Sequence, residues 1–266
     1  MARIVTWEKS KLPLWCFPLV YIGWAWGFWS FIIVSDKNVW TLPNFIFLIV
    51  GGLSPVIAGL GSLWISLGRE GIQDLWCRLI EIHRIRINWF IFIILFYPVL
   101  NFIVALFAFM SDKSVVPIKL ITMDRLFSPS SFLLMMSFAL IFPFVEEIGL
   151  RGYWLDRLQE RFSALSASLI IGILWGIWHL PLFFMEGYYE ESNFDPDLSL
   201  FLFNIMIASI IYTVVYNICY RSLLAIIIFH FMENITGEII GLTSSLHLYI
   251  ILIKALLALF FIWWIS

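Results

Sequence analysis

Charge is scarce in this chain. Only 13% of its 266 residues are Asp, Glu, Lys or Arg, whereas 62% are hydrophobic. A soluble domain of this length cannot bury so much apolar surface in one core, so the composition indicates a membrane protein. The net charge is −2 and no basic run stands out, which removes any reason to expect a nucleic-acid partner.

Cysteine, repeats and low-complexity segments are also scarce or missing. The three cysteines, Cys16, Cys77 and Cys219, are an odd number and lie in or beside apolar stretches. This pattern favours neither a disulfide framework nor a CxxC metal site. No internal repeat divides the chain, so we expect a single integral membrane domain over residues 1–266.

Long apolar stretches predict the membrane spans. About 20 such residues are needed to cross a hydrocarbon core of roughly 30 Å. No small-residue cleavage site follows the first stretch, so it is expected to be retained. The predicted fold class is therefore all-α, a polytopic bundle of about eight transmembrane helices, with spans near 13–34, 44–67, 88–110, 131–158, 163–185, 199–219, 221–242 and 247–265. The polar stretch 68–88 carries charge at helical spacing, which predicts an amphipathic helix at the inner surface.

The distribution of basic residues predicts the orientation of the bundle. With the N-terminus inside, four basic residues lie outside, namely Lys37, Lys113, Lys119 and Arg125. The larger set lies inside, comprising Arg3, Lys9, Lys11, Arg69, Arg78, Arg84, Arg86, Arg157, Arg161 and Arg221. Both termini are therefore predicted to be cytoplasmic; in a prokaryote the membrane would be the cell membrane.

Two adjacent glutamates stand near the middle of the fourth predicted span. An ionisable side chain at this depth costs at least about 2.5–3.5 kcal/mol, so such residues are normally paired and functional. Glu147 and Arg151 in FVEEIGLRGYW are four apart on one helical face, which predicts a structural ion pair. Glu146 points about 100° away from Glu147 and is the candidate general base. Pro143, just before the pair, is expected to kink the helix.

Two more spans carry polar groups. LWGIWHLPLFF places His179 among tryptophans, and IIIFHFMENITGE places His230 and Asn234 four residues apart on one face. Together with Glu146 they offer a base, an imidazole to hold water and two donors for an oxyanion, the set that peptide hydrolysis needs. A lone intramembrane histidine equally fits a hydrogen bond between helices. Glu233 stays unassigned, while His83 and His247 are interpreted as loop or interface residues.

These motifs resemble the CPBP or ABI family of intramembrane peptidases, which includes the type II CAAX prenyl endopeptidases. The resemblance rests on EExxxR at Glu146, Glu147 and Arg151, on the tryptophan-rich segment with His179, and on HxxxN at His230 and Asn234. It covers about residues 140–240, the predicted catalytic core. It implies an intramembrane cavity opening to the cytosol and the bilayer.

The resemblance also implies roles and a substrate. Glu146 and His179 would activate water, His230 and Asn234 would form the oxyanion hole, and Glu147 with Arg151 would support them. The substrate would be a membrane-associated peptide, with the C-terminal CaaX tripeptide of a prenylated protein as the candidate. We expect no cofactor and no metal, because HExxH is missing and asparagine is a poor zinc ligand.

Three alternatives stay open. The first is a zinc-dependent version of the same peptidase, since two histidines and a glutamate could ligate zinc. The second is an ion-coupled transporter, because carboxylates and histidines in spans also mark ion paths. The third is a non-catalytic bacteriocin immunity protein that binds a partner through these helices.

Overall fold

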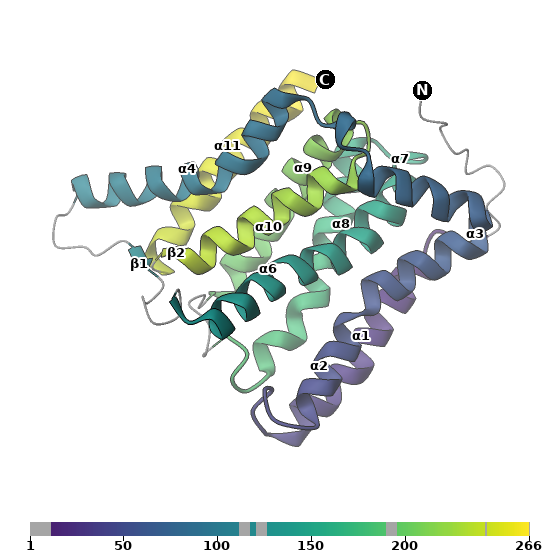
Figure 1. The fold of residues 1–266 in the computed structure, drawn as a ribbon, viewed down its shortest axis with the longest axis horizontal. Helices are drawn as coiled ribbons and strands as arrows, with labels where there is room; N and C mark the ends of the chain where they lie inside the picture. Colours follow the sequence, from purple (N-terminus) through teal and green to yellow (C-terminus); the bar gives the residue numbers. More distant parts are fainter. Residues whose placement is uncertain (1–11, 112–117, 121–126, 190–195, 243, 266) are drawn as a thin grey trace.

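A computed structural model describes residues 12–111, 118–120, 127–189, 196–242 and 244–265 (Figure 1). Lys113 and Arg125, two of the basic residues expected outside, fall beyond the described residues, as do Arg3, Lys9 and Lys11. The first helices are α1 (Cys16–Ser35), α2 (Asn44–Gly52), α3 (Ser54–Ile80), η2 (Ile82–Arg84) and α4 (Ile87–Ser111). After strand β1 (Ile118–Leu120) come α6 (Pro129–Gly149), η3 (Leu150–Trp154), α7 (Leu155–Gln159), α8 (Ala164–His179), η4 (Leu180–Phe184), α9 (Leu198–Ile218), α10 (Leu223–Ile239), β2 (Ile240–Leu242) and α11 (Ser244–Ile265).

The predicted all-α class is confirmed, and the described residues include seven segments long and apolar enough to cross a membrane. The seventh predicted span, 221–242, is not among these segments and folds as α10, whose 17 residues are about 25 Å long. It is shorter than predicted because residues 240–242 leave the helix as strand β2. This strand pairs antiparallel with β1, Ile118 opposite Leu242, a short sheet that the sequence did not predict.

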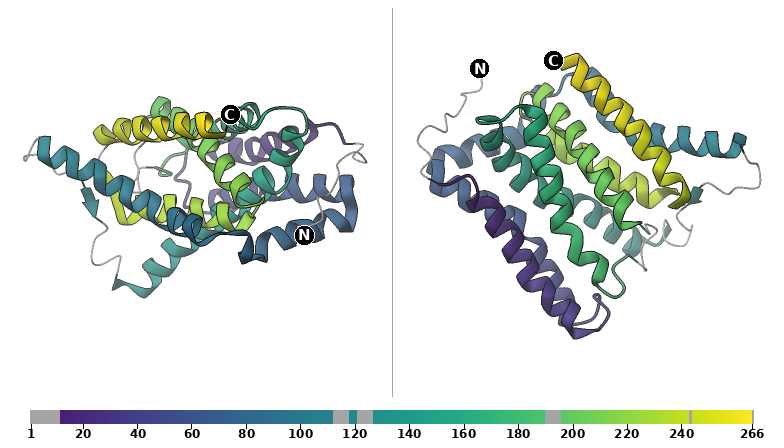
Figure 2. Two further views of the ribbon diagram at one scale, coloured as in Figure 1. Left: turned by 90° about the horizontal axis from the view of Figure 1, so that it is seen from above. Right: turned by 180° about the vertical axis from the view of Figure 1, so that it is seen from behind.

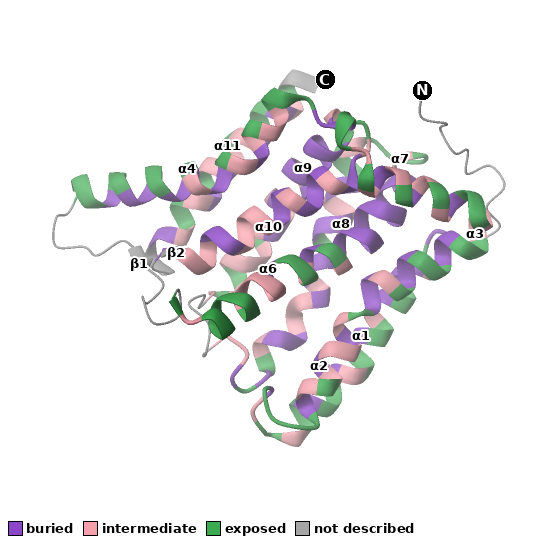
Figure 3. Cartoon of the chain, viewed as in Figure 1, coloured by how far each residue is buried: buried purple, intermediate pink, exposed green. Residues whose placement is uncertain are grey.

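The helices form two layers. α3, α6, α10 and α4 lie side by side in front (Figure 1), and α1, α8, α9 and α11 lie side by side behind (Figure 2). Residues of α8, α9 and α10 are mainly buried or half-buried, whereas α1, α4 and α11 have exposed apolar faces (Figure 3). In a membrane protein such faces contact lipid, so the burial pattern agrees with a bundle set in a bilayer.

Side-chain caps fix where several helices begin. The Ser163, Asp197 and Ser222 side chains accept hydrogen bonds from backbone N–H groups three residues later, at the starts of α8, α9 and α10. Each cap satisfies a donor that has no partner within its helix. The predicted amphipathic segment is helical to Ile80 and continues α3 beyond a sharp bend at Gly68, where a φ of 58° suits glycine.

Glycines let α3 and α6 touch at the backbone. A Cβ atom added at Gly149 would stand 2.3 Å from the carbonyl oxygen of Pro55, and one added at Gly59 would stand 2.7 Å from the Cα of Gly149. No larger residue fits at this crossing. Because Gly149 lies only two residues after Glu147, the contact fixes the depth of Glu146 and Glu147 relative to α3.

Candidate active site

Glu146 is held by a tryptophan from the neighbouring layer. Its side chain lies near the C-terminal end of α6 and is 6% exposed. The indole Nε1 of Trp175, on α8, donates a hydrogen bond of 2.6 Å to Glu146 Oε2. Because the indole is uncharged, this hydrogen bond places no positive charge beside the Glu146 carboxylate.

Glu147 forms the ion pair that its spacing predicts. Arg151 Nη1 lies 3.1 Å from both Glu147 carboxylate oxygens, and neither side chain is exposed. Arg151 Nη2 donates to Ser209 Oγ at 3.3 Å, and its guanidinium stacks between the rings of Trp175 and Tyr212. The helix widens to a π-helical turn at Leu150–Trp154, which begins three residues after Glu147. Such π-turns occur frequently at functional sites.

The two histidines have fixed hydrogen-bond partners. His179 Nδ1 lies 2.8 Å from the backbone carbonyl oxygen of Trp175, which can only accept, so Nδ1 carries a proton and Nε2 of the neutral ring has a lone pair. His230 Nδ1 lies 2.9 Å from Glu147 Oε1 and donates to that carboxylate. Glu147 therefore binds both Arg151 and His230.

A cavity of about 620 Å³ lies between the two layers. All four predicted catalytic residues, Glu146, His179, His230 and Asn234, line it, although they come from three helices. Glu147 and Arg151 are not among its lining residues and lie behind its wall. The structure thus brings the candidate set together and separates it from the paired glutamate and arginine.

A second ion pair in the cavity wall was not predicted. Lys254 Nζ, 1% exposed on α11, lies 2.8 Å from Glu233 Oε1 and donates at 2.8 Å to Asn204 Oδ1. Tyr97 OH donates to Glu233 Oε2 at 2.8 Å, and Tyr212 OH donates to the same oxygen. The sequence signal that could have predicted this ion pair is the lysine inside the last predicted span, because an intramembrane lysine needs a partner. Glu233, left unassigned by the sequence, is that partner.

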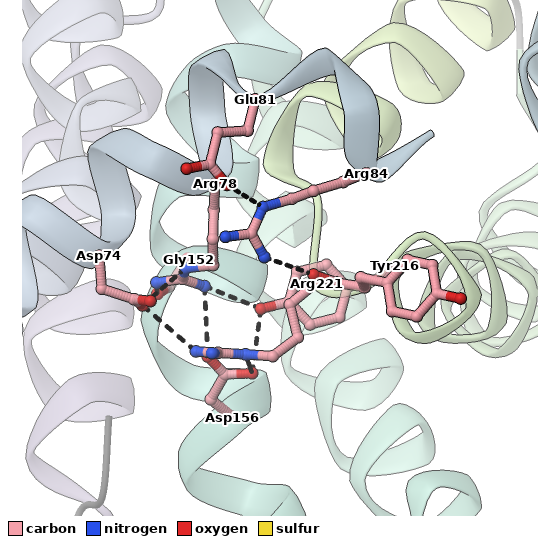
Figure 4. A network of polar contacts seen from close by, with 9 residues as sticks. Asp74, Arg78, Glu81, Arg84, Gly152, Asp156, Tyr216 and Arg221 are labelled. Atoms are coloured by element: carbon pink, nitrogen blue, oxygen red, sulfur yellow. Dashed lines mark hydrogen bonds and ion pairs between the residues drawn. The ribbon is translucent and has the colours of Figure 1, made fainter. Parts of the chain in front are cut away.

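A polar network closes the opposite end of the bundle (Figure 4). Arg78 Nη1 donates to Asp156 Oδ2 at 3.2 Å and to Tyr216 OH at 2.8 Å, and its Nη2 donates to the Gly152 carbonyl oxygen at 2.7 Å. Arg221 Nη2 donates to Asp156 at 2.5 Å. Burial alone would lower the pKa of Arg221, but Asp156, Tyr216 and Asp74 together outweigh it and raise that pKa.

The other two histidines, His83 and His247, lie in different surroundings. His83 is exposed and lies 3.8 Å from the Glu81 carboxylate, where a hydrogen bond from Arg84 lowers the pKa of Glu81. His247, predicted at a loop or interface, lies in the cavity wall on α11. Among the residues with described side chains, no three His, Cys, Asp or Glu are grouped to hold a metal ion.

Comparison with known proteins identifies the part of the chain that carries this site. Residues 128–236 match the family described as type II CAAX prenyl endopeptidase Rce1-like. This segment, less than half of the chain, is similar to that family. A CAAX prenyl protease 2 of Methanococcus maripaludis is 36% identical over 103 residues, an alignment that covers 38% of this chain and 38% of that protein. The matched segment includes Glu146, His179, His230 and Asn234, as the resemblance of the three motifs led us to expect.

Proposed function

We propose that the chain is an intramembrane endopeptidase that hydrolyses a peptide bond of a membrane-associated substrate. One observation carries this proposal: Glu146, His179, His230 and Asn234 line a single buried cavity. A carboxylate base, an imidazole with a free lone pair and two further polar groups are the complement that hydrolysis by water requires. The similarity of residues 128–236 to type II CAAX prenyl endopeptidases supports the same reaction class.

Glu146 and His179 would act on the attacking water. The water gives one proton to the Glu146 carboxylate while its oxygen forms a bond to the scissile carbonyl carbon. His179 Nε2 accepts a hydrogen bond from the same water, because its Nδ1 proton is already held by the Trp175 carbonyl. When the C–N bond breaks, the proton on Glu146 passes to the leaving amine, so the base returns to its starting state.

His230 and Asn234 would stabilise the oxyanion. The Asn234 amide can donate directly, but His230 already donates from Nδ1 to Glu147. For Nε2 to donate as well, the ring must carry both protons, and the adjacent Glu147 carboxylate supplies the negative charge that favours this state. On this mechanism Glu147 stabilises the donor from behind the cavity wall. Loss of one oxyanion donor typically costs about 10²–10³ in kcat.

The candidate substrate is the C-terminal CaaX segment of a prenylated protein. The name of the Methanococcus maripaludis relative suggests it, and apolar side chains such as Leu134, Phe138 and Ile250 in the cavity wall could contact a prenyl chain. The proposed reaction routes no step through a metal.

The test is cleavage of a farnesylated CaaX peptide by the purified protein, read by mass spectrometry beside an unprenylated control. Glu146→Gln and His179→Ala should lower product formation by about 10²–10⁴ while the protein stays folded. Glu70→Gln, at an exposed residue that does not line the cavity, should cleave normally. A strong chelator should leave activity intact; loss of activity that zinc restores would favour the zinc-dependent alternative. Equal cleavage by wild type and Glu146→Gln would rule out the assignment.

A further inference from the structure

The α9 wall of the cavity is apolar except for one amide. The residues of α9 that line the cavity recur at helical spacing, and they are Leu200, Phe201, Asn204, Ile205 and Ala208. Asn204 is half-buried and is the polar member of this row. An amide in an apolar surface is costly unless its oxygen and its N–H groups are hydrogen bonded, so the partners of Asn204 decide what it does.

Lys254 fixes the direction of this amide. Its Nζ lies 2.8 Å from Asn204 Oδ1, and because an ammonium group can only donate, the atom beside it must be the amide oxygen. The amide nitrogen, Nδ2, is therefore on the other branch of the side chain, and among the described residues it has no hydrogen-bond partner. Its two N–H groups are left for a ligand in the cavity that Asn204 lines.

Asn204 is close to the proposed catalytic residues. Phe201, one turn earlier on α9, contacts the ring of His179, and the two ring centroids are 5.3 Å apart. Lys254 Nζ, which holds the Asn204 oxygen, also lies 2.8 Å from Glu233 Oε1. Glu233 belongs to α10, the helix of the two proposed oxyanion donors. The free amide donors therefore lie near both the water-holding histidine and the oxyanion helix.

We infer that Asn204 is a substrate-binding residue whose amide donates a hydrogen bond to an oxygen of the peptide. The inference rests on the proposed function and adds a contact to it. The acceptor is a backbone carbonyl or the terminal carboxylate of the substrate, since an amide N–H group binds either oxygen. Lys254 is 1% exposed and does not line the cavity, so it acts from behind. Its positive charge beside Oδ1 polarises the amide and strengthens the N–H donors.

An extended peptide needs such a donor. Each of its backbone carbonyl groups loses hydrogen bonds to water on entering an apolar cavity, and a donor in the wall offsets that loss. A contact to an oxygen that does not react is equally strong in the bound substrate and in the transition state. Asn204 should therefore contribute to KM and leave kcat nearly unchanged.

Two substitutions isolate the donor. Asn204→Asp keeps an oxygen for Lys254 and removes both N–H groups, whereas Asn204→Leu removes the amide without adding charge. Each should raise KM for the farnesylated CaaX peptide about three- to tenfold and change kcat less than about twofold. Asn217→Asp, at an exposed position of α9 that does not line the cavity, should behave like wild type. An unchanged KM in both variants, or a rise in Asn204→Asp alone, would overturn the inference, the latter because the added charge would then be the cause.

Binding measured without catalysis separates this inference from the proposed function. In the Glu146→Gln protein, adding Asn204→Asp or Asn204→Leu should raise the Kd of the farnesylated peptide by a similar factor. An equal rise for a C-terminally amidated peptide identifies a backbone carbonyl as the acceptor, and a rise confined to the free acid identifies the terminal carboxylate. If the wild type binds the peptide without cleaving it, the proposed function fails and the Asn204 contact stands on Kd. A Kd that neither substitution changes would overturn the contact even if the wild type cleaves.

Discussion

Glu146 and Glu147 are adjacent, but replacing each by glutamine should have different consequences: loss of stability for Glu147 and loss of activity for Glu146. Glu147→Gln removes the charge opposite an arginine that has no exposed surface, and it weakens the contact to His230. Breaking a buried ion pair from one side costs about 3–5 kcal/mol. Because the glutamine oxygen still accepts one hydrogen bond from Arg151, we expect the lower limit, about 3 kcal/mol. For a chain of this size that lowers Tm by roughly 6–12 °C.

Glu146→Gln should leave stability nearly unchanged. The glutamine oxygen can still accept the hydrogen bond from Trp175 Nε1. The indole is uncharged, so the substitution breaks no ion pair at this contact. The free energy of unfolding should therefore change by less than about 1 kcal/mol. Activity should fall by about 10²–10⁴, the usual contribution of a general base.

The assay is thermal unfolding of both variants in detergent, followed by intrinsic tryptophan fluorescence, together with cleavage of the farnesylated peptide. The double variant Glu147→Gln/Arg151→Met serves as control, because removing both charges should recover much of the lost stability. A Glu147→Gln protein that melts with wild type, or a double variant less stable than the single one, would refute this account of the pair.

Three further perturbations follow from the contacts. Gly149→Ala places a methyl group against the backbone of α3 and should lower the free energy of unfolding by about 1–3 kcal/mol, measured by thermal melting. Lys254→Met leaves Glu233 without its cation and should cost on the order of 3 kcal/mol in the same assay. Trp175→Phe removes the donor to Glu146 but keeps an aromatic ring, and should lower kcat/KM about tenfold at a stability cost of about 1 kcal/mol.

The first two of these have matched controls, and the third has a result that would refute it. Gly61→Ala, where nothing lies within 4 Å of the added methyl group, should melt like wild type; equal damage from both alanines would show that helix contact is not the cause. Adding Glu233→Gln to Lys254→Met should restore stability, and a further loss would contradict the pairing argument. Unchanged kcat/KM in Trp175→Phe would show that the indole hydrogen bond does not matter to the reaction.

The sequence was most informative where chemistry and helical spacing coincide. Glu147 and Arg151 are four apart, so their pairing needed no tertiary information, and the structure shows it. That Glu146, His179 and His230 would meet in one cavity was predicted from their positions inside the spans and from the order of the motifs that resemble the peptidase family. Their catalytic roles stay a prediction.

Contacts between distant segments could not be predicted. Arg78 meets Asp156 and Tyr216 across 78 and 138 residues of chain, and no local pattern selects these partners. Lys254 was overlooked because a single lysine barely alters the hydropathy of an otherwise apolar span. The shortening of α10 depends on the pairing of β2 with β1, which again joins residues far apart in sequence.

The adjacency of the two glutamates links the two halves of the proposed reaction. Consecutive helical positions diverge by about 100°, so one turn of α6 faces α8 through Glu146 and α10 through Glu147. Glu146 would activate water, and Glu147 holds His230, the proposed oxyanion donor. The base and the carboxylate that holds the donor are thus fixed to the same short piece of α6 backbone, which Gly149 seats against α3. His230 itself belongs to α10, so its hydrogen bond to Glu147 is the contact that fixes the spacing between base and donor across the scissile bond.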